Sequence, residues 1–345
     1  MDYIFVTVWA AWAAVSAGLL FRLRVFSARP LREAPSRESD LSLLHLGVVF
    51  LLYLGAALVA AVLLNGLPAT ASTAKAPAST TASAATAATA ATAATGRGSA
   101  GSEEHPFRIL AADCIGKFIA ALVMLALAWS LVKGRLRGFG VDVSLAASGM
   151  AKGMLAMFIL APYLYAVMLG TQLISEWIRV TNGWGPPPVH PILKALQEQH
   201  ETPVQYALLV GSALIVAPFV EELFFRGFLQ TILIRLRLGW GPANAGVSGR
   251  GGAPGTDAGT LAYASSGTEF PGRTSARVRW AAIGLASALF AWIHLSEGNY
   301  EVLPPLFVLA VALGYVYERT GNLWSAMTVH FLFNAVSVAD TVFSR

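Results

Sequence analysis

Long apolar runs separated by short polar segments dominate the chain. Each run carries few charged residues and is about 20 residues long, the length that an α-helix needs to cross the hydrocarbon core of a bilayer. Eight runs are predicted as membrane-spanning helices: Tyr3–Phe21, His45–Leu64, Phe107–Val132, Met150–Ile178, Val204–Ile234 (interrupted at Pro218), Trp280–Leu295, Val302–Tyr317 and Leu323–Val338. The pattern therefore predicts an all-α fold, a polytopic membrane helix bundle of about eight transmembrane helices.

Two segments between these runs lack the large apolar residues that a core needs. The segment 67–105 is rich in Ala, Thr and Ser and contains AAT triplets, so we predict a disordered linker. The segment 239–277 is rich in Gly, Ala, Ser and Thr and predicts a long loop, for which a simple insertion is favoured over a functional lid. A short amphipathic piece, Pro191–His200, is predicted to lie on the membrane surface.

Composition agrees with a membrane protein. Of the 345 residues, 56% are hydrophobic and 12% charged, and the mean hydropathy is +0.61. A soluble domain of this length carries about twice that share of charge, so a cytosolic enzyme, a disordered protein and a disulfide scaffold are excluded. The single cysteine, Cys114, leaves neither an intramolecular disulfide nor a cysteine-based metal site.

The net charge of +5 reflects membrane topology rather than a nucleic-acid partner. Lys and Arg concentrate in alternate loops, which indicates that these loops are cytoplasmic and that both termini face outward. The basic residues are Arg22, Arg24, Arg29, Arg32 and Arg37 after the first run, Lys133, Arg135 and Arg137 after the third, and Arg235, Arg237, Arg250, Arg273, Arg277 and Arg279 between the fifth and sixth. We expect an integral, multi-pass protein of the cell membrane.

Ionisable residues inside spanning helices are costly and mark candidate functional sites. Glu221 and Glu222 are adjacent in the fifth run, and Arg226 follows Glu222 by four residues, so these two can pair on one helix face. Glu221 points about 100° away and is left without that partner. A structural role is about as probable as a functional one for Glu222 and Arg226, whereas a functional role is favoured for Glu221.

Two further polar groups lie in later helices. Phe290 and His294 share a face of the sixth run, and His330 and Asn334 share a face of the eighth. At about 1.5 Å per residue, Glu221, both histidines and Asn334 fall within about two helical turns of a common depth. We therefore expect these four residues to line one cavity inside the bundle.

This set of residues suits the hydrolysis of an amide. A buried carboxylate can act as a general base on water, and a histidine can position that water or protonate the departing amine. A His–Asn pair can donate hydrogen bonds to a developing oxyanion. The set Glu221, His294 and His330 could also hold Zn²⁺ with water as the fourth ligand. A metal-free glutamate mechanism and a zinc mechanism both stay open.

The three motifs resemble a known family. Glu221-Glu222-x-x-x-Arg226, Phe290-x-x-x-His294 and His330-x-x-x-Asn334, in this order on successive helices, are similar to the motif set of the CPBP family of CAAX-processing (Rce1-type) and bacteriocin-immunity (Abi) intramembrane proteases. Phe225-Arg226-Gly227 and the Ala217-Pro218 lead-in add to the likeness, which covers about Gly153–Val338. The loop 239–277 departs from the family, which joins its first two motifs more briefly.

The resemblance implies an endopeptidase that cleaves a lipidated or membrane-embedded peptide, prenylated in eukaryotic members. By motif position, Glu221 and His294 would activate water, His330 and Asn334 would form the oxyanion site, and Glu222, Arg226 and Phe290 would support it. The implied organisation is two N-terminal helices (1–66), the linker and a protease domain (106–345). The alternatives are a non-catalytic scaffold or immunity protein with the same bundle, and, with least support, a proton-coupled transporter.

Overall fold

A computed structural model describes residues 3–25, 27, 29–32, 34, 39–65, 106–185, 203–236, 274–295 and 300–343. Within these ranges, eight helices are long and apolar enough to cross a membrane, which confirms the predicted all-α polytopic bundle. The protein is therefore an integral, multi-pass membrane protein. The predicted linker 67–105, the surface piece 191–200 and most of the loop 239–277 lie outside the described residues.

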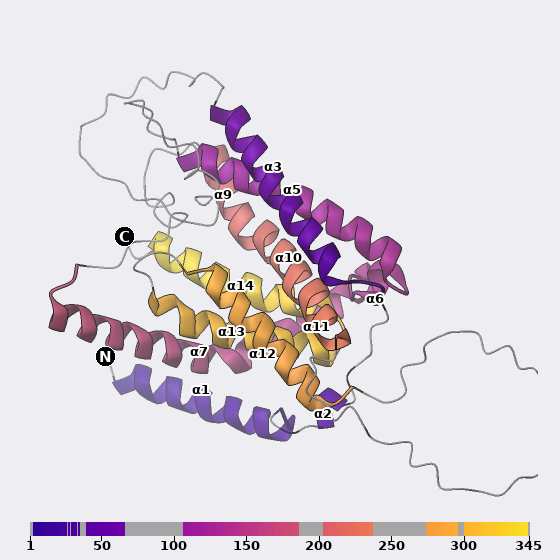
Figure 1. Cartoon of the computed structure of the whole chain (residues 1–345). Coiled ribbons are helices and arrows are strands. Elements are labelled where there is room, and N and C mark those ends of the chain that lie inside the picture. Colours follow the sequence, from indigo (N-terminus) through magenta and orange to yellow (C-terminus); the bar gives the residue numbers. More distant parts are fainter. Residues whose placement is uncertain are drawn as a thin grey trace, which may run out of the picture.

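The helices follow the apolar runs closely (Figure 1). Seven of the spans are formed mainly by α1 (Tyr3–Arg22), α3 (Leu43–Asn65), α5 (Pro106–Leu131), α7 (Ala146–Asn182), α12 (Ala276–Ile293), α13 (Leu303–Thr320) and α14 (Leu323–Phe343). The other span comprises α9 (Pro203–Gly211), η3 (Ser212–Val216), α10 (Ala217–Glu222), η4 (Leu223–Gln230) and α11 (Thr231–Arg235). The short turns α2 (Arg29–Arg32) and α6 (Arg135–Gly138) lie between spans, whereas η2 (Val143–Leu145) and η6 (Tyr300–Val302) begin the spans of α7 and α13.

Two details differ from the sequence prediction. The helix is not interrupted at Pro218, because α10 continues directly from η3. The predicted loop 239–277 ends slightly earlier than expected. Ser275 accepts a hydrogen bond from the Val278 amide over 3.3 Å and starts α12 at Ala276.

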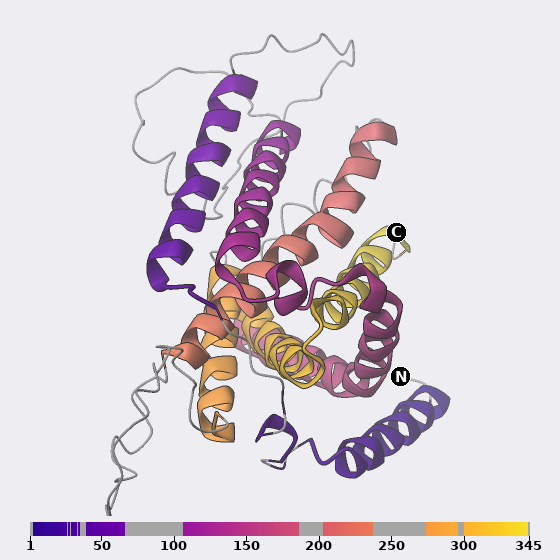
Figure 2. The same ribbon diagram turned by 90° about the vertical axis from the view of Figure 1, so that its right-hand side faces the viewer.

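The helix pairs that pack most closely are α3 with α5, α7 with α14 and α12 with α13. Figure 2 shows α3 and α5 running side by side at one edge of the bundle and α1 at the opposite edge. The loops between α1 and α3, between α5 and α7, and between α13 and α14 meet at one end of the bundle, where the Tyr317 hydroxyl donates to the Phe139 carbonyl over 3.0 Å. The basic loops therefore gather on one side, as the charge pattern predicts.

The first helix, α1, is attached through hydrogen bonds to the backbone of α7. Pro162 has no N–H, so the Phe158 carbonyl one turn earlier loses its usual helical partner. The indole of Trp12 donates to that carbonyl over 3.0 Å, and the indole of Trp9 donates to the Pro162 carbonyl over 3.2 Å. Backbone groups at membrane depth must be paired within the protein, so this proline provides a specific attachment for α1.

The connector between α1 and α3 crosses the ends of three other helices. Arginines from α11, α12 and α13 donate to its backbone carbonyls: Arg235 to Leu41 over 2.8 Å, Arg279 to Ala34 over 3.1 Å and Arg319 to Pro30 over 3.0 Å. Arg279 also forms a buried ion pair with Glu318. The N-terminal helices are therefore fastened to the C-terminal half through both α7 and this connector.

The α7–α14 contact requires glycine on α7. A Cβ atom at Gly153 would lie 2.5 Å from the Ser325 carbonyl oxygen and 2.6 Å from the Thr328 Cβ, both on α14. At Gly170, further along the same helix, a Cβ atom would meet nothing within 4 Å. Small residues let membrane helices approach closely, because packing replaces the hydrophobic effect as the force between them.

We expect Gly153→Ala to destabilise the protein and Gly170→Ala to be neutral or slightly stabilising. Overpacking a rigid contact costs about 1–3 kcal/mol, whereas alanine favours an open helix position over glycine by about 1 kcal/mol. Thermal unfolding of the purified variants in one detergent measures the difference. Equal melting temperatures for the two variants would contradict the close α7–α14 packing.

Candidate active site

The helix that carries the paired glutamates has π-helical turns on both sides of them. η3 precedes α10 and η4 follows it, so Glu221 and Glu222 end a short α-helical stretch between two wider turns. π turns pair residues five apart, are rare, and occur often at functional sites. An added residue in a turn rotates the following side chains around the helix axis, so the sequence spacing alone misplaces them.

Asn334 satisfies a carbonyl group that this irregular helix leaves unpaired. In η3 the Ala217 amide donates to the Ser212 carbonyl, five residues back. The next donor in that series would be residue 218, a proline without an N–H. The Ala213 carbonyl therefore lacks its helical partner, and Nδ2 of Asn334 donates to it over 2.8 Å. This contact gives Asn334 a positioning role between α14 and η3.

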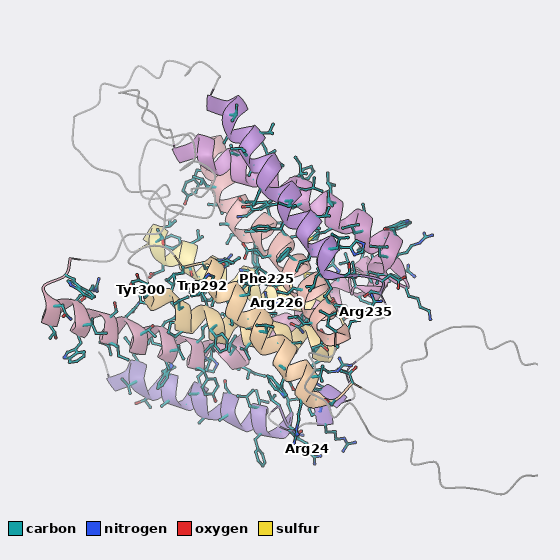
Figure 3. All side chains as sticks on the ribbon, viewed as in Figure 1. Arg24, Phe225, Arg226, Arg235, Trp292 and Tyr300 are labelled. Carbon is teal, nitrogen blue, oxygen red and sulfur yellow. The ribbon has the colours of Figure 1, made fainter. Side chains whose placement is uncertain are left out.

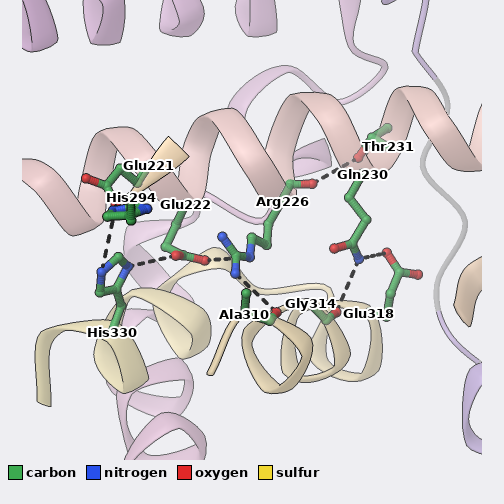
Figure 4. A network of polar contacts seen from close by, with 10 residues as sticks. All are labelled: Glu221, Glu222, Arg226, Gln230, Thr231, His294, Ala310, Gly314, Glu318 and His330. Carbon is green, nitrogen blue, oxygen red and sulfur yellow. Dashed lines mark hydrogen bonds and ion pairs between the residues drawn. The ribbon is translucent and has the colours of Figure 1, made fainter. Parts of the chain in front are cut away.

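Glu222 and Arg226 form the buried base of the site. Their side chains are 0% and 2% exposed, and Nε of Arg226 lies 3.1 Å from Oε2 of Glu222. Arg226 also donates to the Ala310 carbonyl over 3.1 Å, and its guanidinium carbon lies 4.8 Å from the ring centre of Phe290. The predicted Glu222–Arg226 pair is thus present and is held by α12 and α13 (Figure 4).

His330 links this pair to the second glutamate. Nδ1 of His330 lies 2.8 Å from Oε1 of Glu222, a distance at which it donates to the ionised carboxylate. Its other nitrogen, Nε2, lies 3.8 Å from Oε2 of Glu221. The histidine side chain is 5% exposed, so Glu222 fixes the ring orientation.

His294 faces the same oxygen from α12. Its Nδ1 lies 2.7 Å from the Phe290 carbonyl, which can only accept, so Nδ1 carries the proton. Nε2 of His294 lies 3.6 Å from Oε2 of Glu221. That oxygen is buried and accepts no hydrogen bond from the residues that the structure describes. Two imidazole nitrogens from separate helices therefore point at one unsatisfied carboxylate oxygen (Figure 4).

The site is open on one side and closed on the other. The side chains of Glu221 and His294 are 16% and 28% exposed, whereas Glu222 is fully buried. Glu221 and His294 are thus accessible to a bound molecule, and Glu222 with Arg226 forms the inner wall. The sequence analysis expected this difference in role between the two glutamates.

Residues 203–254 and 259–336 match the family model described as type II CAAX prenyl endopeptidase Rce1-like. Residues 203–336 belong to the Rce1-like family, a finding that supports assignment to the CPBP family. No curated protein and no solved structure matches the chain significantly. The family is one of proteases, so a membrane-embedded peptide hydrolase with a membrane-associated protein substrate is the class of function indicated.

The Rce1-like segment contains every site residue that the sequence analysis named. The structure brings together Glu221, Glu222, Arg226, Phe290, His294 and His330, while the contact it gives for Asn334 is the Ala213 carbonyl. The assignment of catalytic and supporting roles stays a prediction.

Sequence reasoning missed Lys117, which lies near the middle of α5 and outside the Rce1-like segment. Its ammonium group interacts electrostatically with Glu221 and His294. A lysine inside an otherwise apolar spanning helix is itself a sequence signal. The signal was overlooked because Lys117 belongs to none of the three motifs.

The predicted zinc ligands, Glu221, His294 and His330, face one another in the site. Among the described side chains, no group of three or more His, Cys, Asp or Glu is arranged to hold a metal ion. Each histidine uses Nδ1 for a supporting contact, His330 with Glu222 and His294 with the Phe290 carbonyl, and each Nε2 is directed at Glu221. Zinc binding through Glu221 and the two histidines stays a prediction.

We expect Glu222→Gln to destabilise the protein far more than Glu221→Gln. Removing one partner of a buried ion pair leaves the other charge uncompensated, which costs about 3–5 kcal/mol, and Arg226 would be that charge. Glu221 is partly exposed and, among the described residues, forms no ion pair with a guanidinium, so its neutral amide should be tolerated. Thermal unfolding in detergent measures the stability of both variants. Similar decreases in melting temperature would contradict the different structural roles of the two glutamates.

Proposed function

We propose that this protein is an intramembrane endopeptidase that uses Glu221 to activate the attacking water. The observation that carries the proposal is the buried Oε2 of Glu221, faced by Nε2 of His294 at 3.6 Å and by Nε2 of His330 at 3.8 Å. These separations exceed direct hydrogen bonds. A water molecule between the three groups could donate to the carboxylate and to one imidazole, which would orient its lone pair toward a substrate carbonyl.

The reaction then needs one proton to travel from water to the departing amine. Glu221 accepts the proton as the water oxygen attacks the carbonyl carbon. The C–N bond breaks, and the proton passes to the amine nitrogen through His294, the more exposed imidazole. Water supplies the hydroxyl group of the new carboxyl terminus. General acid–base catalysis of this kind contributes about 100- to 10,000-fold to the rate.

His330 is proposed to stabilise negative charge on the carbonyl oxygen. Its Nδ1–H donates to Glu222, which fixes the ring so that Nε2 faces the site, and a proton on Nε2 would donate to the oxyanion. The second proton on Nδ2 of Asn334 is proposed as the other donor, because Ala213 uses the first. The π turn at η3 sets the position of this amide.

The proposed substrate is the lipidated end of a membrane-associated protein. Support comes from the family description, which names prenylated CAAX proteins, and from the location of Glu221 within a spanning helix. A lipid anchor would hold the scissile bond at the membrane, where an embedded site can reach it. The predicted orientation places the cleaved end near the cytoplasmic side.

Peptide cleavage by the purified protein tests the function. A prenylated peptide should be cleaved faster than its unmodified counterpart, and Glu221→Gln and His294→Asn should each lower kcat by about 100-fold or more. Glu176→Gln on α7 removes an exposed carboxylate and serves as the matched control with full activity. Normal turnover by both site variants would overturn the proposal. A Glu221→Gln protein that retained its cellular role would instead favour a non-catalytic scaffold or immunity protein.

We expect peptidase activity to persist after treatment with a chelator such as 1,10-phenanthroline. The proposed water activation uses only Glu221 and the two imidazoles, and these donors are not arranged as a metal site. Activity should be measured together with the metal content of the same preparation. Loss of activity on chelation, restored by Zn²⁺, would revive the predicted zinc mechanism.

A further inference from the structure

A cluster of arginines surrounds a small polar cavity at the end of the bundle where the basic loops gather. The cavity has a volume of about 190 Å³ and is lined by Arg22, Leu23, Arg24, Arg29, Pro30 and Arg319. Four of these six residues are arginines and none is acidic. The four come from three places: the end of α1 and the turn after it, α2, and the end of α13. Arg24 lies at the end of α1 in Figure 3.

The membrane-topology rule does not account for this convergence. It requires basic residues on the cytoplasmic side but not around one cavity. Guanidinium groups that share a cavity repel one another unless an anion lies between them. Arg319 also anchors the Pro30 carbonyl over 3.0 Å, which fixes α2 and hence Arg29 at the cavity. The arginines are therefore brought together by the fold.

The backbone at Arg24 forms a turn that usually carries glycine. The Val25 amide donates to the Leu20 carbonyl over 3.1 Å and the Arg24 amide donates to the Phe21 carbonyl over 3.0 Å. This pattern is a Schellman turn, in which the residue at the position of Arg24 is usually glycine because its φ angle is positive. Arg24 has φ of 52°, an uncommon conformation for a residue with a side chain. The turn would form more easily with glycine, so Arg24→Gly removes the guanidinium without disturbing the backbone.

We propose that this arginine cavity binds a phosphate group, in the first place that of an anionic phospholipid headgroup. Guanidinium groups bind phosphate through paired N–H donors, and basic pockets at the cytoplasmic surface hold anionic headgroups. The cavity lies where α1 ends, at the level where the headgroups of that leaflet begin. A bound headgroup bridges α1, α2 and α13, and so stabilises the attachment of the N-terminal helices.

The fold offers a variant that removes the charge without damaging the turn. Arg24→Gly replaces the guanidinium with the residue that this turn favours, so folding should be preserved. Arg29→Gln provides a second site in the same cavity. The matched control is Arg135→Gln/Arg137→Gln, which removes two exposed arginines that line other parts of the predicted cytoplasmic surface.

Binding to the full-length protein in detergent should be measured with three probes: dioctanoyl phosphatidylglycerol, dioctanoyl phosphatidylcholine and inorganic phosphate. We expect phosphatidylglycerol to bind and to raise the melting temperature, and Arg24→Gly to weaken its binding about fivefold. The control double variant should bind as the unaltered protein does. If inorganic phosphate also binds in an Arg24-dependent way, the site is confirmed and its ligand can be a soluble phosphate.

Two results would overturn the proposal. In the first, neither phosphate probe binds with an affinity that depends on Arg24. In the second, the control double variant loses as much affinity as Arg24→Gly combined with Arg29→Gln, which would show a general effect of surface charge. The melting temperature of Arg24→Gly without ligand should equal that of the unaltered protein. This control shows that any loss of binding does not come from a loss of folding.

Discussion

The buried pair of Glu222 and Arg226 constrains the rest of the structure, because two charges inside a bundle must be matched closely to be tolerated. Both are fully enclosed, Oε1 of Glu222 contacts His330 on α14, and Arg226 donates to the Ala310 carbonyl on α13. Further polar contacts between η4 and α13 follow at four-residue steps along both helices. Gln230 donates to the Gly314 carbonyl and to Glu318, and Glu318 pairs with Arg279, which holds the Ala34 carbonyl. The site and the N-terminal connector are thus two ends of one row of polar contacts.

Two prolines extend the same principle to the backbone. Each removes a helical donor inside a spanning helix, and in each case a side chain from another helix supplies the missing hydrogen bond. Trp12 donates to the carbonyl freed by Pro162, and Asn334 donates to the carbonyl freed by Pro218. Since an unpaired carbonyl is costly at membrane depth, each proline converts a local defect into a specific contact between helices. Asn334 therefore secures α14 against η3.

The sequence was sufficient for the helices and for most of the site because each depends on a local rule. Apolar length predicts the spans, and the i,i+4 spacing predicts the pairing of Glu222 with Arg226. The partners of Asn334 and Lys117 could not be predicted in this way. The contact of Asn334 with the Ala213 carbonyl arises from a π turn that shifts the helical register. The interaction of Lys117 with Glu221 arises from the packing of α5 beside η3 and α10. The proposed phosphate-binding role of the arginine cavity was also not predicted. The topology rule explains why the arginines lie on the cytoplasmic side without requiring a ligand.

The difference between the two adjacent glutamates follows from their surroundings. Glu222 is bound by a guanidinium and an imidazole, so a change in its charge would disturb three helices. Glu221 lies one residue earlier and is partly exposed, and its Oε2 faces two imidazole nitrogens at distances beyond a hydrogen bond. It can therefore gain or lose a proton without breaking the bundle. In the proposed reaction, Glu222 orients His330 and Glu221 exchanges protons with water, so an i,i+1 pair on one helix supplies both roles.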